Sequence, residues 1–304
     1  MGFNFDVKIS VIIPTFGRPL FLKKCIESVQ RQSFHEWELI VVDDNDPDTD
    51  ARKETEKIME AVKVEDSRVK YIQHEFNENG AVARNTGFAV AQGEYISLLD
   101  SDDEYLPNRL QRCYDVMKMA LADVAGVYTG CEFRRKGRVY RKYTNVKTGS
   151  FLEDTLACTF MFCTGSNIFV RKSVIDELQG FDPTFLRQQD YEFLVRLFER
   201  YSLIGIPEIL VVKNNENFNV PNIDKQIAIR DQYLGKFSNI IESLPKDTQK
   251  YIYFSNYIAL AETAMSQNKF SIANEYYKKA QNYGHMSMRN WLRRIAFPFY
   301  NVIK

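Results

Sequence analysis

The residues of this chain that most clearly suggest chemistry are Asp100, Ser101, Asp102 and Asp103. They directly follow the apolar run YISLL at 95–99, which predicts a buried strand. Carboxylates this close together repel and raise one another's pKa unless a cation lies among them. Hard oxygen ligands suit Mg²⁺ or Mn²⁺, ions that usually carry substrate phosphates. Taken alone, a charged turn with Asp103 capping the following helix explains the pattern about as well.

Two further strands are predicted to end near these carboxylates. Residues 9–18 (ISVIIPTFGR) and 38–46 (ELIVVDDND) are short β-branched runs bounded by turn residues. The segment between them carries apolar residues at helical spacing, so the three pieces form a βαβ unit. In open α/β sheets, ligands bind beyond the carboxyl ends of the strands. We therefore expect the two strand ends to share a crevice with Asp100 and Asp102.

The rest of the first two hundred residues continues this alternation. It predicts helices at 50–64, 81–91 and 107–122, and strands at 69–75, 94–99, 125–133 and 166–170. The fold class is therefore α/β, with a mostly parallel central sheet flanked by helices. Residues 134–147 carry seven Lys or Arg and no acid, which favours a solvated hairpin or loop over a dedicated anion site.

The C-terminal part of the chain has a different pattern. Residues 213–222 (KNNENFNVPN) are polar and Asn-rich and predict a linker. Helical segments are predicted after it, at 223–243, 247–267, 269–283 and 287–297. We therefore expect an α/β domain that carries the candidate site at 1–215 and an α-helical extension at 216–304.

Composition excludes several classes of protein. The 304 residues carry 40 basic and 40 acidic side chains, so a general nucleic-acid binder is not expected. The five cysteines are odd in number and lack CxxC spacing, which predicts reduced thiols and a cytoplasmic location. The three histidines lack metal-ligand spacing, so a histidine-based metal site is not expected. There is no apolar run of about 18 residues, and the first predicted strand has no leader-like segment ahead of it, so we expect neither a membrane-spanning helix nor a signal peptide.

Five motifs occur in an order and spacing that resemble a known family. They are SVIIPTFGR, ELIVVDDND, NGAVARNTG (79–87), GEYISLLDSDDEYLPNRL (93–110) and QQDYEF (188–193). Over roughly residues 8–210 the chain resembles the family 2 glycosyltransferases of bacterial polysaccharide biosynthesis. The resemblance implies a GT-A fold and an inverting enzyme that uses a nucleotide sugar, with UDP as the expected nucleotide.

The resemblance also assigns roles to individual residues. It implies a nucleotide pocket formed by Pro14, Thr15, Phe16, Arg18, Asp44, Arg84, Asp100 and Ser101. Asp102 is expected to bind Mn²⁺ or Mg²⁺, and Ser166 and Asn167 are expected to bond sugar hydroxyls. Asp190 is the expected general base. Gln189 stands where the family commonly has an acid, which puts in doubt the acceptor contact of that position.

The resemblance further implies a glycan or lipid-linked saccharide as the acceptor. Basic and aromatic residues alternate near the C-terminus, which predicts peripheral contact with the inner face of the cell membrane or, equally, a packed helix or an oligomer contact. A sugar nucleotidyltransferase is an alternative, but PTFGRP lacks the glycine-rich basic loop that a triphosphate needs. A non-catalytic nucleotide-sugar or glycan-binding module is disfavoured because Asp102 and Asp190 are both present.

Overall fold

The computed structural model describes residues 7–215 and 221–285. They form two compact units, residues 7–150 with 161–215, and residues 151–160 with 221–285. This division departs from the predicted one, because the segment 151–160 belongs with the C-terminal helices rather than with the first domain. The predicted boundary after residue 215 borders residues 216–220, which lie outside the description.

The first half of the large unit has the predicted alternation of strands and helices. Its elements are β1 (Ile9–Thr15), α1 (Pro19–Gln30), β2 (Trp37–Asp43), α2 (Asp50–Glu65), β3 (Val69–Gln73), α3 (Gly80–Val90) and β4 (Tyr95–Leu98). Strands β1, β2 and β4 are buried along nearly their whole length. Continuous burial explains why these strands appear in the sequence as unbroken apolar runs rather than as alternating ones.

The second half is less regular than predicted. Its elements are β5 (Glu104–Tyr105), α4 (Arg109–Lys118), β6 (Val124–Arg135), β7 (Arg138–Tyr143), the 3₁₀ turn η1 (Gly165–Asn167), β8 (Phe169–Arg171), α6 (Lys172–Glu177), α7 (Gln189–Phe198) and β9 (Ser202–Asn214). The basic segment forms the predicted hairpin, β6–β7. The strand predicted at 166–170 is a 3₁₀ turn followed by a shorter strand. Residues 213 and 214, predicted as linker, end β9.

All of these strands belong to one sheet, in the order β3-β2-β1-β4-β8-β6-β9-β5, with β7 paired to β6. Strands β1 to β4 are mutually parallel, β8 is antiparallel to both β4 and β6, and β9 is parallel to β6. The carboxyl ends of β1, β2, β4, β6 and β9 therefore meet at one edge of the sheet. The predicted α/β class is confirmed, and this edge is where a ligand is expected.

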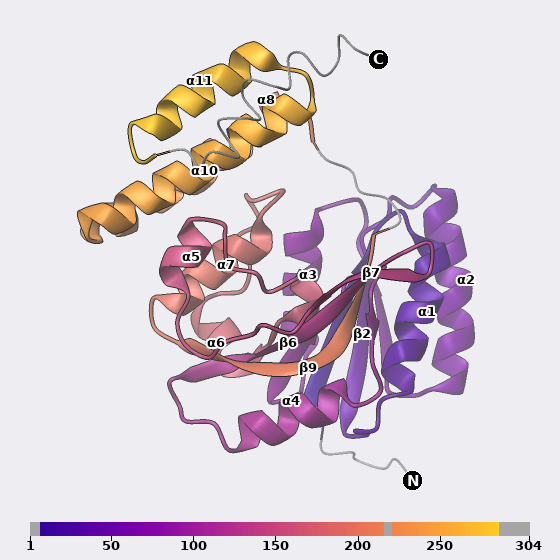
Figure 1. The fold of residues 1–304 in the computed structure, drawn as a ribbon. Coiled ribbons are helices and arrows are strands. Elements are labelled where there is room, and N and C mark those ends of the chain that lie inside the picture. Colours follow the sequence, from indigo (N-terminus) through magenta and orange to yellow (C-terminus); the bar gives the residue numbers. More distant parts are fainter. Residues whose placement is uncertain (1–6, 216–220, 286–304) are drawn as a thin grey trace. The chain divides into compact units, whose positions relative to one another are not determined.

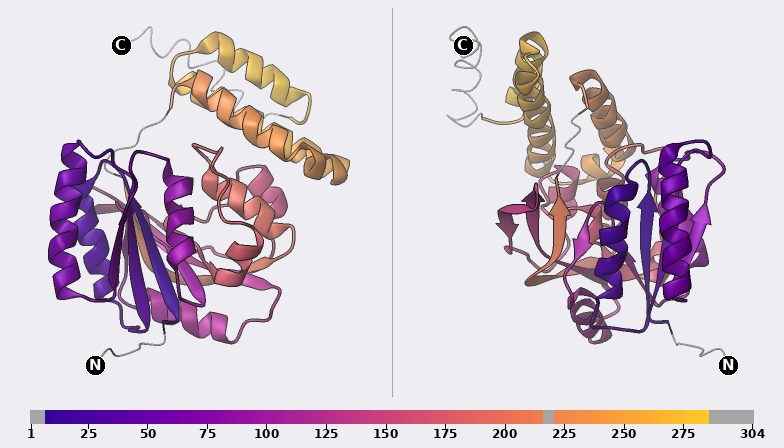
Figure 2. Two further views of the ribbon diagram at one scale, coloured as in Figure 1. Left: turned by 180° about the vertical axis from the view of Figure 1, so that it is seen from behind. Right: turned by 90° about the vertical axis from the view of Figure 1, so that its right-hand side faces the viewer.

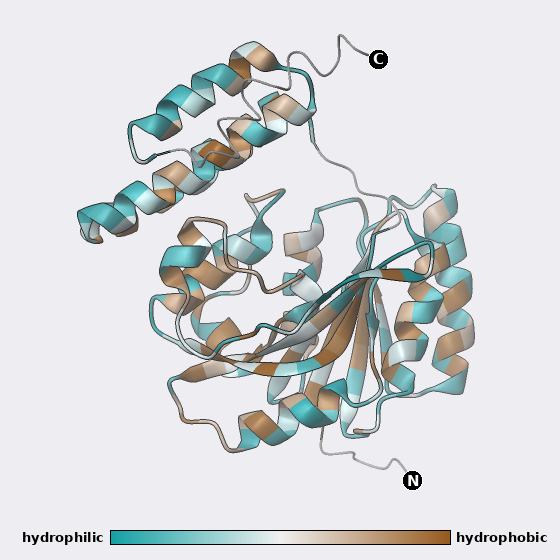
Figure 3. Cartoon of the chain, viewed as in Figure 1, coloured by the Kyte–Doolittle hydropathy of each residue, from teal (hydrophilic) through white to brown (hydrophobic). Residues whose placement is uncertain are grey.

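Helices cover both faces of the sheet (Figures 1 and 2). Helices α1, α2 and α4 contribute buried residues such as Ile26, Met59 and Leu110 to the main core, against Val11 and Val41 of the strands. Helix α3 lies on the opposite face, where Gly87 packs directly on Ile12 of β1. The strands are correspondingly the most hydrophobic part of the unit (Figure 3).

The smaller unit is helical, as predicted. It contains α5 (Leu152–Leu156), α8 (Ile223–Lys236), α9 (Ser238–Ser243), α10 (Lys246–Ser266) and α11 (Phe270–Gln281). Its core includes Leu260, Ala264 and Tyr277. The helix predicted at 287–297 lies outside the described residues. Within the described ranges, every helix is too short or too polar to cross a bilayer.

Candidate active site

A cavity of about 710 Å³ opens at the carboxyl edge of the sheet, a volume in the usual range for small-molecule sites. Its walls come from the loops after β1 and β4, the starts of α3 and α7, and the end of β9. The predicted nucleotide residues all line it, namely Pro14, Thr15, Phe16, Arg18, Asp44, Arg84, Asp100 and Ser101. Asp102, Gln189 and Asp190 line it too, so the fold brings together motifs up to 176 residues apart in the sequence.

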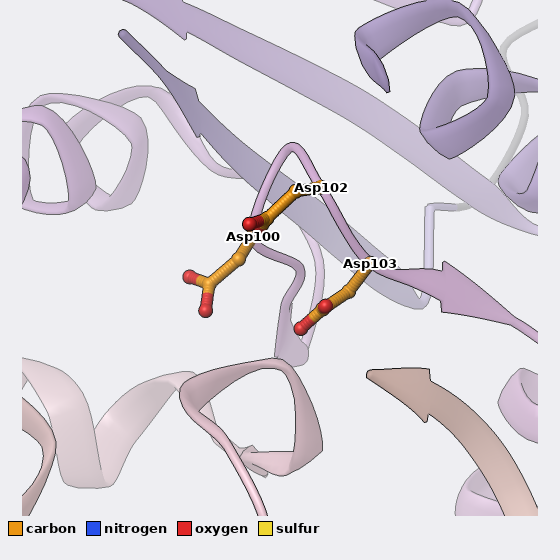
Figure 4. Close-up of side chains that lie close together, drawn as sticks. All are labelled: Asp100, Asp102 and Asp103. Atoms are coloured by element: carbon orange, nitrogen blue, oxygen red, sulfur yellow. The ribbon is translucent and has the colours of Figure 1, made fainter. Parts of the chain in front are cut away.

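The acidic cluster lies on one short turn between β4 and β5, drawn in Figure 4. Oxygens of Asp100, Asp102 and Asp103 lie within 4.8 Å of one another. The side chains of Asp100 and Asp102 are 25% and 17% exposed, whereas that of Asp103 is fully buried. The first two carboxylates are therefore the ones that a ligand in the cavity can reach.

Two arginines neutralise the reachable carboxylates. Arg84 Nη2 donates to Asp100 Oδ1 at 2.8 Å, and Arg18 forms an ion pair with Asp102. Burial raises the pKa of Asp100, but the nearby Arg84 and Lys213 outweigh it and hold the pKa below its ordinary value. Asp100 is therefore ionised at neutral pH and available as a hard oxygen ligand.

Asp103 has a different character from its neighbours. Burial is the main cause that raises its pKa to about 7; Asp100 and Asp102 add to the rise, and Lys213 opposes it. Ser166 donates to Asp103 Oδ2 at 2.5 Å, and the Asn214 backbone N–H donates to Oδ1 at 3.2 Å. Asp103 thus fixes the turn, but it precedes β5 and does not cap a helix, so the capping role considered for it is wrong. The donor set that fits a divalent cation is Asp100 and Asp102.

Asp190 stands in the first turn of α7, at the wall of the same cavity. Its Oδ1 is buried and has no hydrogen-bond partner among the described residues. Removal from bulk water is the main cause that raises the pKa of Asp190; Arg84 lowers it and Asp100 raises it. A carboxylate with a raised pKa and an unused lone pair is suited to accept a proton.

Close packing positions this carboxylate. A Cβ on Gly165 would lie 2.8 Å from Asp190 Oδ1, so only glycine leaves room for the side chain there. Arg84 Nη1 donates to Gln189 Oε1 at 2.9 Å, which ties the start of α7 to α3. Gln189 therefore serves as a partner of Arg84 in this structure, and its predicted contact with the substrate stays a prediction.

Two side chains after β1 are suited to hold a nucleotide. Thr15 is buried, yet its Oγ1 has no partner among the described residues, and it lines the cavity. Phe16 lines the cavity with 56% of its surface exposed, an unusual position for a large aromatic side chain. A buried hydroxyl without a partner and an open aromatic face are the features that a base and its ribose can satisfy.

Asp44 is more heavily engaged than its predicted role suggests. His74 Nδ1 lies 2.7 Å from its Oδ1, and the backbone N–H of Glu78 donates to the same oxygen at 2.8 Å. Asn77 Nδ2 and the Asn79 backbone N–H donate to its Oδ2 at 2.8 Å and 3.0 Å. Asp44 therefore holds the loop that leads into α3. A hydrogen bond to a base would require one of these four donors to move.

Two predicted sugar ligands are corrected by the structure. Ser166 and Asn167 are fully buried and do not line the cavity. The Asn167 amide bonds Arg109, Thr129 and the carbonyl of Phe162, while Ser166 bonds Asp100 and Asp103. Both residues lie in a 3₁₀ turn beneath the acidic turn instead of in an exposed strand. They position the site from below and do not reach a bound sugar.

Replacing Asn167 by Ala is expected to destabilise the protein by about 3 kcal/mol. The change removes hydrogen bonds at 2.6 Å and 3.0 Å from its Nδ2 to the Thr129 and Phe162 carbonyls, and leaves the buried Arg109 guanidinium without one acceptor. Urea unfolding measures the loss, with Asn282→Ala at the exposed end of α11 as the control. An unchanged unfolding midpoint would contradict the structural role.

The cysteine prediction is wrong for two of the five residues. Cys131 of β6 and Cys163, just before η1, form a disulfide with their Cα atoms 6.6 Å apart, although 32 positions separate them in the sequence. Cys25 and Cys113 are buried thiols. Residue count and CxxC spacing could not reveal the pair, because the fold alone brings them together. The cysteines therefore no longer support a reducing compartment.

The disulfide is expected to stabilise the large unit by about 4 kcal/mol, since it closes a loop of this length in the unfolded chain. The double variant Cys131→Ser/Cys163→Ser should unfold at a lower urea concentration than the oxidised wild type. Dithiothreitol should bring the wild type to the variant's midpoint and leave the variant unchanged. Equal midpoints for all four samples would show that the bond contributes nothing.

Lys213 was not predicted as part of the site. It lies at the end of β9, and its Nζ lies 3.2 Å, 3.7 Å and 3.8 Å from oxygens of Asp103, Asp102 and Asp100. Residues 213–222 look like a linker because five of the ten are Asn and Pro221 lies among them. The signal that could have located it is the preceding run EILVV, a β-branched strand whose carboxyl end carries Lys213.

The chain is similar to known proteins over its large unit. The family model described as glycosyl transferase family 2 matches residues 10–179. The GalNAc(5)-diNAcBac-PP-undecaprenol beta-1,3-glucosyltransferase of Campylobacter jejuni is 33% identical over 138 residues, which are 45% of this chain and 42% of that protein. The chain thus spans less than half of the length of this relative.

Solved structures show the same fold. S. aureus TarS 1-349 in complex with UDP-GlcNAc has a TM-score of 0.60 at 17% identity, over 97% of this chain and 92% of that one. The mannosyltransferase PcManGT from Pyrobaculum calidifontis, in complex with GDP-Man and Mn²⁺, has a TM-score of 0.58 at 18% identity, over 99% and 87%. The expected GT-A fold is confirmed. Because the family model covers more than half of its residues, the chain belongs to glycosyl transferase family 2.

Proposed function

We propose that this protein is an inverting glycosyltransferase that moves a sugar from a nucleotide sugar, with UDP as the nucleotide, to a hydroxyl of a glycan or lipid-linked acceptor. The observation that carries the proposal is the placement of Asp190, with an unused carboxylate oxygen, in the same cavity as Asp100 and Asp102. A proton acceptor and a cation-binding carboxylate pair are the two groups that such a transfer needs.

The nucleotide half of the donor is proposed to lie along the loop after β1. Phe16 offers a face for the base, and the buried Thr15 hydroxyl offers a hydrogen bond. Arg18 and Arg84 are cations within the cavity lining that can bind phosphate oxygens. The TarS complex with UDP-GlcNAc, which shares the fold, supports a UDP-sugar.

Asp100 and Asp102 are proposed to hold Mn²⁺ or Mg²⁺ against the diphosphate. Their hard oxygen atoms and their exposure to the cavity fit such an ion. When bound, the ion neutralises the charge that develops on the departing nucleoside diphosphate. The Mn²⁺ complex of PcManGT supports a metal of this class. Asp103 stays beneath the turn and keeps it in place.

Asp190 is proposed to act on the acceptor. As the acceptor hydroxyl oxygen forms a bond to the anomeric carbon, the bond from that carbon to the diphosphate breaks, and the hydroxyl proton passes to Asp190. Attack from the face opposite the leaving group inverts the configuration at that carbon. Gln189 next to it holds Arg84 and does not compete for the proton.

The acceptor class is proposed from a relative. The C. jejuni glucosyltransferase is named for an undecaprenol-diphosphate-linked substrate, which supports a lipid-linked saccharide here. Such an acceptor would bring the enzyme to the inner face of the cell membrane. The basic and aromatic segment predicted to make that contact, residues 286–304, lies outside the described residues, so peripheral attachment through it stays a prediction.

A thermal-shift screen tests the donor assignment. UDP-, GDP- and dTDP-sugars with Mn²⁺ are added to the protein, and the UDP-sugars are expected to raise the melting temperature most. A ligand at 100 times its Kd stabilises the native state by about 2.7 kcal/mol, which is a shift of several degrees. Arg84→Ala should lose most of the shift. If no nucleotide sugar changes the wild-type melting temperature, the proposed donor site is wrong.

A further inference from the structure

Lys213 lies where a cation bound to the acidic turn would lie. Its Nζ is within 4 Å of all three carboxylates, at 3.2 Å from Asp103, 3.7 Å from Asp102 and 3.8 Å from Asp100. Its side chain is 20% exposed and lines the cavity. An ammonium group in this position and a divalent ion held by Asp100 and Asp102 would share the same ligand atoms.

Strand pairing fixes the position of this lysine. Strand β5 begins at Glu104, immediately after the acidic turn, and pairs with Val212 of β9. The next residue along β9 is Lys213, and Asn214 Nδ2 donates to the Asp102 carbonyl at 3.0 Å. The lysine therefore faces the turn because of the sheet register, and a random surface side chain would not show this geometry.

The charges of the turn are balanced without any metal. Arg84 pairs with Asp100 and Arg18 pairs with Asp102. The third positive charge, that of Lys213, lies beside the fully buried Asp103. A divalent cation alone would add positive charge to a cluster whose carboxylates already have positive partners, at a distance where the repulsion from the ammonium is strong. A nucleoside diphosphate brings the negative charge that removes this imbalance.

We propose that Lys213 is a built-in counter-ion that makes metal binding depend on the diphosphate. This inference rests on the proposed function. Before the donor arrives, the ammonium neutralises the carboxylates and weakens their affinity for a metal. When the metal and the diphosphate are both bound, the flexible four-carbon side chain turns its ammonium from the turn to the diphosphate oxygens in the same cavity. Lys213 thereby couples the affinities of the two ligands, and such a coupling is reciprocal.

The test measures Mn²⁺ binding itself, by electron paramagnetic resonance of free Mn²⁺, with and without UDP. In the wild type, UDP is expected to tighten Mn²⁺ binding at least tenfold. Lys213→Gln keeps an N–H donor for Asp103 but removes the charge. It should bind Mn²⁺ without UDP at least fivefold more tightly than the wild type, and UDP should improve its Mn²⁺ affinity much less.

Three further variants separate charge from packing. Lys213→Arg keeps the charge and should retain the weak Mn²⁺ binding of the wild type. Lys63→Met, on the exposed face of α2, should change nothing. If Lys213→Gln has an altered melting temperature, Lys213→Met serves as a second variant that removes the charge. If every folded charge-removing variant binds Mn²⁺ alone no more tightly than the wild type, Lys213 is not the counter-ion.

The outcomes also separate this inference from the proposed function. Failure of the wild type to bind either UDP or Mn²⁺ would overturn both. The wild type could bind both UDP and Mn²⁺ and transfer sugar while the charge-removing variants keep the wild-type coupling between UDP and Mn²⁺. That result would overturn only the role of Lys213.

Discussion

Replacing Asp190 by Asn is expected to lower turnover by about 10²- to 10⁴-fold, the usual effect of losing a general base. Asparagine keeps the shape that fits against Gly165, where the carboxylate has so little room. It cannot take the proton of the acceptor hydroxyl. The affinity for the donor should stay near that of the wild type, since Asp190 is assigned to the acceptor. Steady-state kinetics and calorimetry with the nucleoside diphosphate measure the two quantities separately.

The pH dependence gives an independent check on Asp190. Only the ionised carboxylate accepts a proton, so activity should fall as the pH drops through its pKa. Because burial raises that pKa, the fall should occur at a higher pH than for an exposed aspartate. The remaining activity of Asp190→Asn should lack this fall. A variant that loses donor affinity but turns over at the wild-type rate would contradict the assignment.

Asp102→Ala is expected to abolish detectable transfer, because it removes one of the two carboxylates assigned to the metal. Its stability should change little. Asp102 pairs with Arg18, whose side chain is 41% exposed, and more distantly with Lys213 at 3.7 Å, and partly exposed ion pairs contribute about 0–1 kcal/mol. The two expectations together distinguish a loss of function from a loss of fold.

The matched control is Asp176→Ala, which removes an aspartate from the exposed Lys172–Asp176 ion pair on α6. It should keep both the activity and the melting temperature of the wild type. Mn²⁺ binding in the presence of UDP should be lost in Asp102→Ala and retained in the control. Transfer by purified Asp102→Ala at the wild-type rate would show that Asp102 is not a metal ligand.

The first half of the fold was predictable because its strands are buried on both faces. Runs such as SVIIP and ELIVVD are typical of strands that lie between helices, and their polar ends mark the carboxyl edge. Because parallel strands end at the same edge of the sheet, a shared crevice was predicted for the loop after β1 and the acidic turn, and Arg18 does lie beside Asp102 there. The site was therefore predicted where local pattern and parallel topology agree.

The residues that the sequence misplaced depend on long-range pairing. Strand β5 has only two residues, and its pairing with β9 helps to bring Lys213 to the acidic turn. The residue type of Asn167 suits a sugar ligand, whereas its amide is hydrogen-bonded to the buried Thr129, Arg109 and Phe162. The Cys131–Cys163 bond likewise joins segments that no periodic pattern connects.

Product release tests most directly whether this cavity transfers a sugar. The protein is incubated with UDP-sugars, Mn²⁺ and lipid-linked saccharide acceptors, and UDP, pyrophosphate and the extended acceptor are quantified. We expect equal amounts of UDP and extended acceptor, both abolished by Asp102→Ala and strongly reduced by Asp190→Asn. Release of pyrophosphate in a parallel incubation with UTP and a sugar 1-phosphate would indicate a nucleotidyltransferase, and tight donor binding without any product would indicate a non-catalytic module; either result would rule out sugar transfer as the function of this cavity.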